Sequence, residues 1–139
     1  MINIKLSSLD IRAVRGPKTR QELLNLGKKC PPVYGDPAIL MPHIFVPEND
    51  HKKHKVTLIS HYADNKTISN DLNINSLDII TTDYKNFITE ICQSELVVSS
   101  SLHGIILSET YGVPAILLLP EGACTFKYED WYNSTGRYD

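Results

Sequence analysis

Hydrophobic and polar positions along residues 55–119 follow the two periods that distinguish strands from helices. Residues 84–94 carry apolar side chains at helical spacing, and residues 102–111 predict a second helix. The short apolar segments around these helices predict buried strands, which are residues 55–61, 77–82, 96–100 and 113–119. The last strand is apolar along its length, which is typical of a parallel strand covered on both faces.

End signals support both helices. Asp83 suits the N-cap of the first, because a short carboxylate side chain accepts hydrogen bonds from first-turn N–H groups. Gly112 suits the end of the second, since glycine readily adopts the left-handed conformation that follows a helix. The alternation of strand and helix predicts an α/β fold with a doubly wound, mostly parallel, Rossmann-like sheet and right-handed crossovers.

The chain before residue 55 is less regular. Residues 9–16 predict a short alternating strand that ends at a glycine. Pro17 then opens a helix that Gly27 closes. Residues 47–54 are polar and charged, which indicates a linker. At the other end of the chain, residues 126–138 are aromatic and charged and predict a partly helical tail.

Composition narrows the class of protein. With 139 residues, of which 42% are hydrophobic and 22% charged, the chain can bury a core without disulfides or metal. Its 14 basic and 16 acidic side chains give a net charge of −2, so no global basic charge attracts nucleic acid. Three cysteines without CxxC spacing indicate a reducing compartment and argue against a zinc ribbon. His51 and His54 lie among lysines, which predicts a solvated cluster, and no metal site is expected.

The sequence shows neither a membrane span nor a secretion signal. The longest strongly apolar run, residues 113–120, has eight residues, whereas a spanning helix needs about 20. Residues 1–6 lack a basic region followed by an apolar core. We therefore expect a cytoplasmic protein that is not an integral membrane protein and has no nucleic-acid partner.

The residues most suited to ligand binding or catalysis lie where the third predicted strand ends and the next helix begins. Residues 99–104, called the corner below, are three serines, a leucine, a histidine and a glycine. Ligands of open α/β sheets bind beyond the carboxyl ends of strands, and free N–H groups at a helix N-terminus attract anions. The predicted anion ligands are Ser99, Ser100 and Ser101. Gly104 would let the anion approach the backbone, and His103 would donate a hydrogen bond or transfer a proton.

Other residues could complete this site. His61 ends the first predicted strand and shares the corner's edge of the sheet if the two strands are parallel. Glu109 could reach a hydroxyl, and Arg15 could hold an anion or be a surface charge. The pattern of the corner equally fits a serine-rich N-cap before a core helix, with His103 in a structural role.

Six segments of the sequence, taken together, resemble the polysaccharide pyruvyl transferase family, in particular the bacterial exopolysaccharide ketal-pyruvate transferases. The matching segments appear in order and cover nearly the whole chain. They are IRAVRGPKTR at 11–20, VYGDPAIL at 33–40, ISHYAD at 59–64, VVSSSLHG at 97–104, ETYGVP at 109–114 and FKYEDWYNSTGR at 126–137.

The resemblance implies transfer of a pyruvyl group from phosphoenolpyruvate, with no further cofactor, onto two hydroxyls of a sugar to give a ketal. The acceptor would be a sugar of an exopolysaccharide or its lipid-linked oligosaccharide precursor, and the enzyme would be cytoplasmic or peripheral to the inner membrane. His103 resembles the donor-site histidine of the family. Ser101 stands where many members have an arginine for the donor's anionic groups, so Arg15, Lys127 or Arg137 would supply positive charge.

The resemblance also implies a two-domain fold like that of the GT-B glycosyltransferases, and members are roughly twice as long as this chain. Residues 1–46 look like a remnant of the N-terminal domain, its last β–α unit, and residues 47–54 like the linker. Residues 55–139 look like the Rossmann-like, donor-binding C-terminal half. We therefore expect a fragment, a truncated product or half of a split protein, which self-associates or pairs with the missing half.

Two other functions stay open. One is a catalytically inactive remnant that binds an anionic ligand or a partner chain. The other is a GT-B-like glycosyltransferase that uses a nucleotide sugar, with Glu109 on the ribose.

Overall fold

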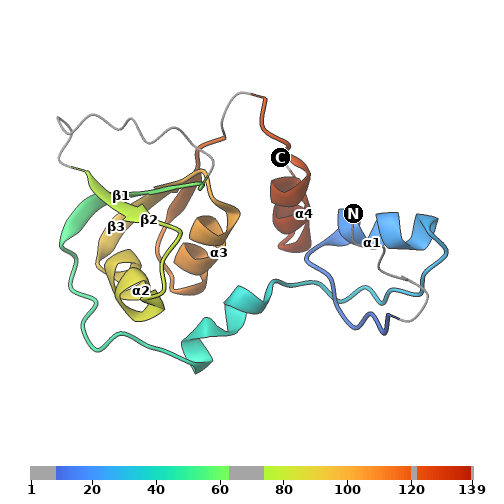
Figure 1. Cartoon of the computed structure of the whole chain (residues 1–139), viewed down its shortest axis with the longest axis horizontal. Helices are drawn as coiled ribbons and strands as arrows, with labels where there is room; N and C mark the ends of the chain where they lie inside the picture. Colours follow the sequence, from blue (N-terminus) through green and yellow to red (C-terminus); the bar gives the residue numbers. More distant parts are fainter. Residues whose placement is uncertain (1–8, 63–73, 120–121, 139) are drawn as a thin grey trace. The chain divides into compact units, whose positions relative to one another are not determined.

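The computed structural model describes residues 9–62, 74–119 and 122–138 (Figure 1). Contacts divide the chain into two compact units. Unit 1 consists of residues 1–36 and 124–139, and unit 2 consists of residues 37–123. None of the described helices has both the length and the apolar character needed to cross a membrane.

The boundaries of these units differ from those predicted at residues 46 and 55. The 3₁₀ helix η2 (Pro37–His43) belongs to unit 2, where it packs on α3 (Leu102–Thr110). Nearby, the Tyr111 hydroxyl donates a 2.6 Å hydrogen bond to the Phe45 carbonyl. The tail from residue 124 belongs to unit 1. The roles of an N-terminal remnant and a donor-binding domain stay predictions.

Unit 2 is built on a parallel sheet. Its strands are β1 (His54–Ser60), β2 (Asn75–Asp78), β3 (Ser94–Ser99) and β4 (Ala115–Leu117). Their order across the sheet is β2-β1-β3-β4, and every pairing is parallel. In this register Ser99 pairs with Ile59 on one side and with Leu117 on the other. The predicted α/β class with a parallel, Rossmann-like sheet is confirmed.

Helices α2 (Tyr84–Cys92) and α3 lie on the same side of the sheet (Figure 1). Ile59 of β1 and Val97 of β3 are fully buried there. They form a core with Phe87, Ile91 and Val113. One face of β4 is less well covered. Ile116, in the middle of this strand, is 53% exposed. The prediction that the fourth strand is covered on both faces is therefore wrong at this residue.

Strand boundaries depend on local side-chain bonds that the hydrophobic pattern does not show. The predicted strand at 77–82 is instead β2, which ends at Asp78. The Asp78 carboxylate accepts a 2.9 Å hydrogen bond from the Ile80 N–H, which turns the chain away from the sheet. The predicted strand at 113–119 is shorter as well, since only Ala115–Leu117 pairs with β3.

The predicted end signals of the helices of unit 2 are confirmed. The Asp83 carboxylate accepts a 3.1 Å hydrogen bond from the Asn86 N–H and so caps α2. Gly112 follows α3 with a φ of 73°, in the left-handed region that favours glycine.

The capping role of Asp83 can be tested by removing its side chain. We expect Asp83→Ala to lower the free energy of unfolding by about 1 kcal/mol, because a first-turn N–H loses its acceptor. Asp50→Ala is the control, since Asp50 is exposed and lies outside any helix. Urea denaturation of the full chain measures both variants. Equal losses in the two variants would contradict a stabilising cap at Asp83.

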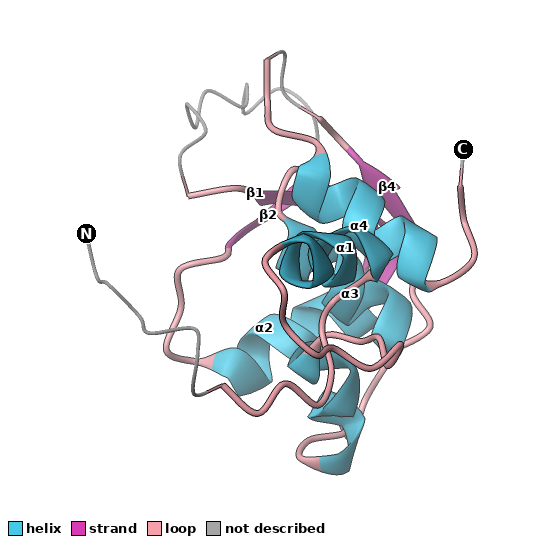
Figure 2. Ribbon diagram, turned by 90° about the vertical axis from the view of Figure 1, so that its right-hand side faces the viewer, coloured by secondary structure: helices cyan, strands magenta, loops and turns pink. Residues whose placement is uncertain are grey.

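Unit 1 joins helices from opposite ends of the sequence. α1 (Pro17–Asn25) packs against α4 (Phe126–Ser134). Both helices are labelled in Figure 2. Pro17 occupies the predicted first turn of α1, and Gly27 follows the helix with a φ of 70°, so both end signals are confirmed. The strand predicted at 9–16 is wrong, because among the described residues only Val14 pairs, in a single bridge with Tyr34.

The fully buried Asp130 of α4 joins the two helices of unit 1 through hydrogen bonds. Its carboxylate accepts hydrogen bonds from the Lys18 N–H at 2.8 Å and the Thr19 N–H at 3.0 Å. The Thr19 hydroxyl donates a third at 2.5 Å, and the Arg15 Nε lies 3.5 Å away. Gly16, the N-cap of α1, has no side chain to cap its own helix, and a Cβ there would overlap the Asp130 backbone. A carboxylate from α4 therefore caps α1.

Candidate functional site

The strand order places a topological switch point between β1 and β3. The chain passes from β1 to β2 on one side, and from β3 through α3 to β4 on the other side. Ligands of open α/β sheets bind outside the carboxyl ends of strands at such a point. His61 directly follows β1, and the corner begins at the last residue of β3. Because β1 and β3 are parallel, the prediction that these residues share one edge of the sheet is confirmed.

Ser99 stabilises the corner from inside and has no exposed surface. Its hydroxyl lies 2.8 Å from the Ile59 carbonyl and 3.0 Å from the Ser101 carbonyl, and it can donate its proton to either. The same oxygen accepts the Ser101 N–H at 3.0 Å. The Ser99 hydroxyl thus forms its hydrogen bonds with other groups of the protein. This differs from the prediction that Ser99 contacts a ligand.

Ser100 links the segments that follow β1 and β3. Its hydroxyl accepts a 2.8 Å hydrogen bond from the His61 N–H, and its own N–H donates to the Ile59 carbonyl at 3.2 Å. The residue is buried. The backbone of His61 is therefore held beside the corner, while its ring lies 4.3 Å from the ring of Tyr62.

Ser101 is the N-cap residue of α3 and has an extended backbone with φ −96° and ψ 128°. It is only 4% exposed, yet its hydroxyl makes no capping bond to α3 and no other hydrogen bond within the described part of the chain. The first N–H groups of a helix have no intrahelical partners. A serine hydroxyl that makes no capping bond, at a helix N-terminus without a side-chain cap, forms an arrangement that suits an anion.

His103 and Gly104, both in the first turn of α3, differ in exposure. His103 is exposed, so its imidazole is accessible to a ligand. Gly104 is buried, and a Cβ there would lie less than 3.0 Å from the Ser99 Oγ and 3.1 Å from Ile59 Cγ2. The protein itself fills the space left by the missing side chain. Gly104 therefore serves close packing of α3 on the sheet, which corrects the prediction that it makes room for a ligand.

Three predicted site residues belong to other elements than the corner. Glu109 lies six residues beyond His103 in α3, or about 9 Å along the helix axis at 1.5 Å per residue. Arg15 and Lys127 belong to unit 1. Arg15 faces the carboxylate of Asp130, and the Lys127 ammonium lies 4.9 Å from the centre of the Tyr128 ring.

Sequence reasoning missed the role of Asp130. The available signal was Gly16, because a helix that begins with glycine and proline has no side chain of its own for the N-cap. Ala63 and Asp64, which end one of the segments that carry the family resemblance, lie outside the described residues.

The described residues show no cluster of metal ligands, and the Cys92 thiol does not suit a nucleophile. No group of three or more histidine, cysteine or acidic side chains is placed there to hold a metal ion. His54 instead lies 2.9 Å from the carboxylate of Glu90. Burial raises the pKa of the Cys92 thiol, which opposes formation of a thiolate nucleophile.

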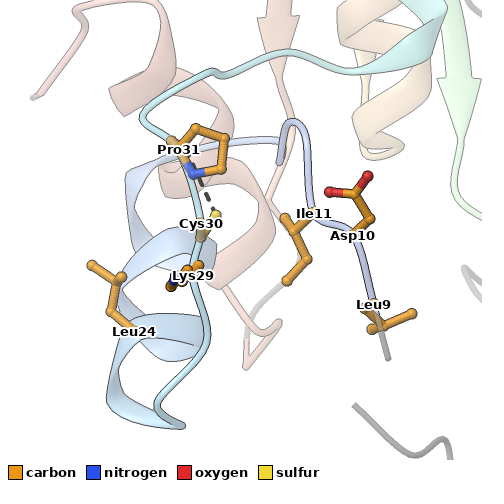
Figure 3. Close-up of a pocket in the computed structure, with 7 residues that line it drawn as sticks. All are labelled: Leu9, Asp10, Ile11, Leu24, Lys29, Cys30 and Pro31. Atoms are coloured by element: carbon orange, nitrogen blue, oxygen red, sulfur yellow. Dashed lines mark hydrogen bonds between the residues drawn. The ribbon is translucent and has the colours of Figure 1, made fainter. Parts of the chain in front are cut away.

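A pocket of about 760 Å³ lies in unit 1. Figure 3 shows the side chains around it. The lining residues are Leu9, Asp10, Ile11, Leu24, Lys29, Cys30 and Pro31. None of them is a predicted site residue.

Comparison with known proteins agrees with the family resemblance found in the sequence. Residues 1–121 match the family described as polysaccharide pyruvyl transferase. The succinoglycan biosynthesis protein ExoV of Rhizobium meliloti (strain 1021) is 29% identical over 135 residues, which cover 91% of this chain and 41% of that protein. The chain thus spans less than half the length of this relative, and α4 lies outside the residues matched to the family.

Proposed function

This chain belongs to the polysaccharide pyruvyl transferase family, and from that premise we propose that it binds phosphoenolpyruvate at the corner and transfers its pyruvyl group to a sugar. The relative's name assigns that protein to the biosynthesis of succinoglycan, a polysaccharide. We propose a sugar of an exopolysaccharide, or of its lipid-linked precursor, as the acceptor here. Since the chain spans 41% of that relative, the same proposal covers a form that needs a partner chain for turnover.

One observation carries this proposal. At the switch point between β1 and β3, the N-terminus of α3 has no side-chain cap and begins at Ser101, whose hydroxyl makes no capping bond. The exposed imidazole of His103 comes two residues later, in the first turn of α3. Positive dipole, hydroxyl and imidazole are the groups needed to hold a small dianion and to move a proton beside it.

The reaction assigns these groups different tasks. Two acceptor hydroxyls add to C2 of phosphoenolpyruvate, and the bond from C2 to the phosphate oxygen breaks. One hydroxyl proton goes to C3, and the other leaves with inorganic phosphate. The amides of α3 and the Ser101 hydroxyl would hold the phosphate or carboxylate, while His103 would transfer protons, with His61 as the second candidate. Arg15, Lys127 and Glu109 stay sequence predictions for donor binding.

Ligand-induced stabilisation separates the three candidate functions. A ligand that binds only the folded chain raises the free energy of unfolding by about 2.7 kcal/mol at 100 times its Kd. We expect phosphoenolpyruvate to raise the melting temperature of the full chain and pyruvate, which lacks the phosphate, to raise it much less. A rise with nucleotide sugars alone would instead favour the glycosyltransferase. Stabilisation by phosphoenolpyruvate without phosphate release on any acceptor would favour the inactive remnant or a form that needs a partner chain for turnover.

A further inference from the structure

We propose that Ser99 is a positioning residue, whose buried hydroxyl sets the geometry of the corner and thereby the strength with which the corner holds an anion. The inference rests on the proposed function, in which the corner binds phosphoenolpyruvate. It gives Ser99 a role different from that of a ligand, since the side chain has no exposed surface.

The hydrogen bonds of Ser99 meet at one residue of the corner. The Ser101 N–H donates to the Ser99 hydroxyl at 3.0 Å, and the Ser101 carbonyl lies 3.0 Å from the same oxygen. The Ser101 carbonyl also accepts the Ile105 N–H at 3.2 Å, in the first turn of α3. The position of the N-cap residue, and with it the direction of the first amides of α3, is therefore fixed by a side chain of β3.

A second set of contacts ties Ser99 to neighbouring strands. Its hydroxyl lies 2.8 Å from the Ile59 carbonyl at the end of β1, and its carbonyl accepts the Leu118 N–H at 2.9 Å, just beyond β4. The absent side chain of Gly104 leaves the space that this hydroxyl uses. Ser99 thus holds the corner in a fixed position relative to the sheet. A site whose hydrogen-bond donors must point in fixed directions needs such support.

Ser108 provides a matched control within the same helix. It is also fully buried, and its hydroxyl donates a 2.7 Å hydrogen bond to the Gly104 carbonyl. That bond lies within α3 and involves neither Ser101 nor a strand. Loss of either hydroxyl removes a buried hydrogen bond, but only loss of the Ser99 hydroxyl frees the N-cap residue of α3.

The test compares Ser99→Ala with Ser108→Ala in the full chain. Phosphoenolpyruvate is titrated while the backbone amide resonances of residues 100–104 are followed by NMR, and urea denaturation gives the stability of each variant. We expect Ser99→Ala to raise the Kd about tenfold, which corresponds to one misdirected hydrogen bond of about 1.4 kcal/mol. Ser108→Ala should leave the Kd within about twofold of wild type. If Ser99→Ala does not fold, Ser99→Cys keeps a weak donor of similar size and should give an intermediate Kd.

The outcomes separate this inference from the proposed function. Wild-type binding with equal Kd values in both variants overturns the positioning role and leaves the proposed function intact. Equal weakening in both variants does the same, because it tracks stability alone. A wild-type corner whose amide resonances do not respond to phosphoenolpyruvate overturns the proposed function, and the positioning role falls with it.

Discussion

Replacement of His103 by alanine is expected to lower the rate of pyruvyl transfer at least about a hundredfold, because a positioned proton-transfer group typically contributes 10²–10⁴-fold. The free energy of unfolding should change little. The side chain is exposed in the first turn of α3, so its removal creates no cavity in the core.

Phosphate release from phosphoenolpyruvate, measured with a panel of glycoside acceptors, reports the rate, and urea denaturation reports stability. His51→Ala is the matched control, since His51 is exposed and lies outside any helix or strand. A His103→Ala variant that unfolds under conditions where the control is stable would show that this histidine is structural. A variant with full activity would remove it from the reaction.

Asp130→Ala is expected to destabilise unit 1 by about 3 kcal/mol or more, because each donor left without its acceptor costs about 1–3 kcal/mol. Two amides and one hydroxyl of α1 lose their acceptor at once. The Arg15 Nε, which is buried and has no hydrogen-bond partner, loses the only charge it faces among the described residues. Loss of the carboxylate also removes the N-cap of α1.

Glu129→Ala is the matched control, because Glu129 precedes Asp130 in α4 and is paired with Lys18 at the surface. The hydrogen bond from Lys18, followed by one from Thr125, lowers the pKa of Glu129, but water and salt screen such an exposed pair. Hydrogen exchange of the amides in α1 and α4 measures both variants. Protection that falls equally in the two variants, or in neither, would contradict the fastening role of Asp130.

Local sequence signals predicted the helices of unit 2 well, because the residues that form and end them are neighbours in the chain. Asp83 caps α2 three residues before its partner Asn86, and Gly112 lies two positions after the last residue of α3. The strand-to-helix transition at the corner is equally local, which is why the sequence located it. The predicted family was confirmed by the match over residues 1–121.

Strand ends were less predictable, since hydrophobicity does not stop where pairing stops. The apolar Ile80 lies beyond the end of β2 because the Asp78 side chain turns the chain first. Val14 has one partner in the described residues, so the alternating pattern at 9–16 was no sign of a full strand.

The sequence by itself determined the α/β class, the place of the corner and the family, because periodicity, caps and motif order are properties of adjacent residues. The tertiary structure alone decided what the individual residues do. Ser99 meets Ile59 from 40 positions away, and Asp130 meets Lys18 from 112 positions away. A buried hydroxyl or carboxylate takes its role from the groups that surround it after folding, and chain distance carries no information about those groups.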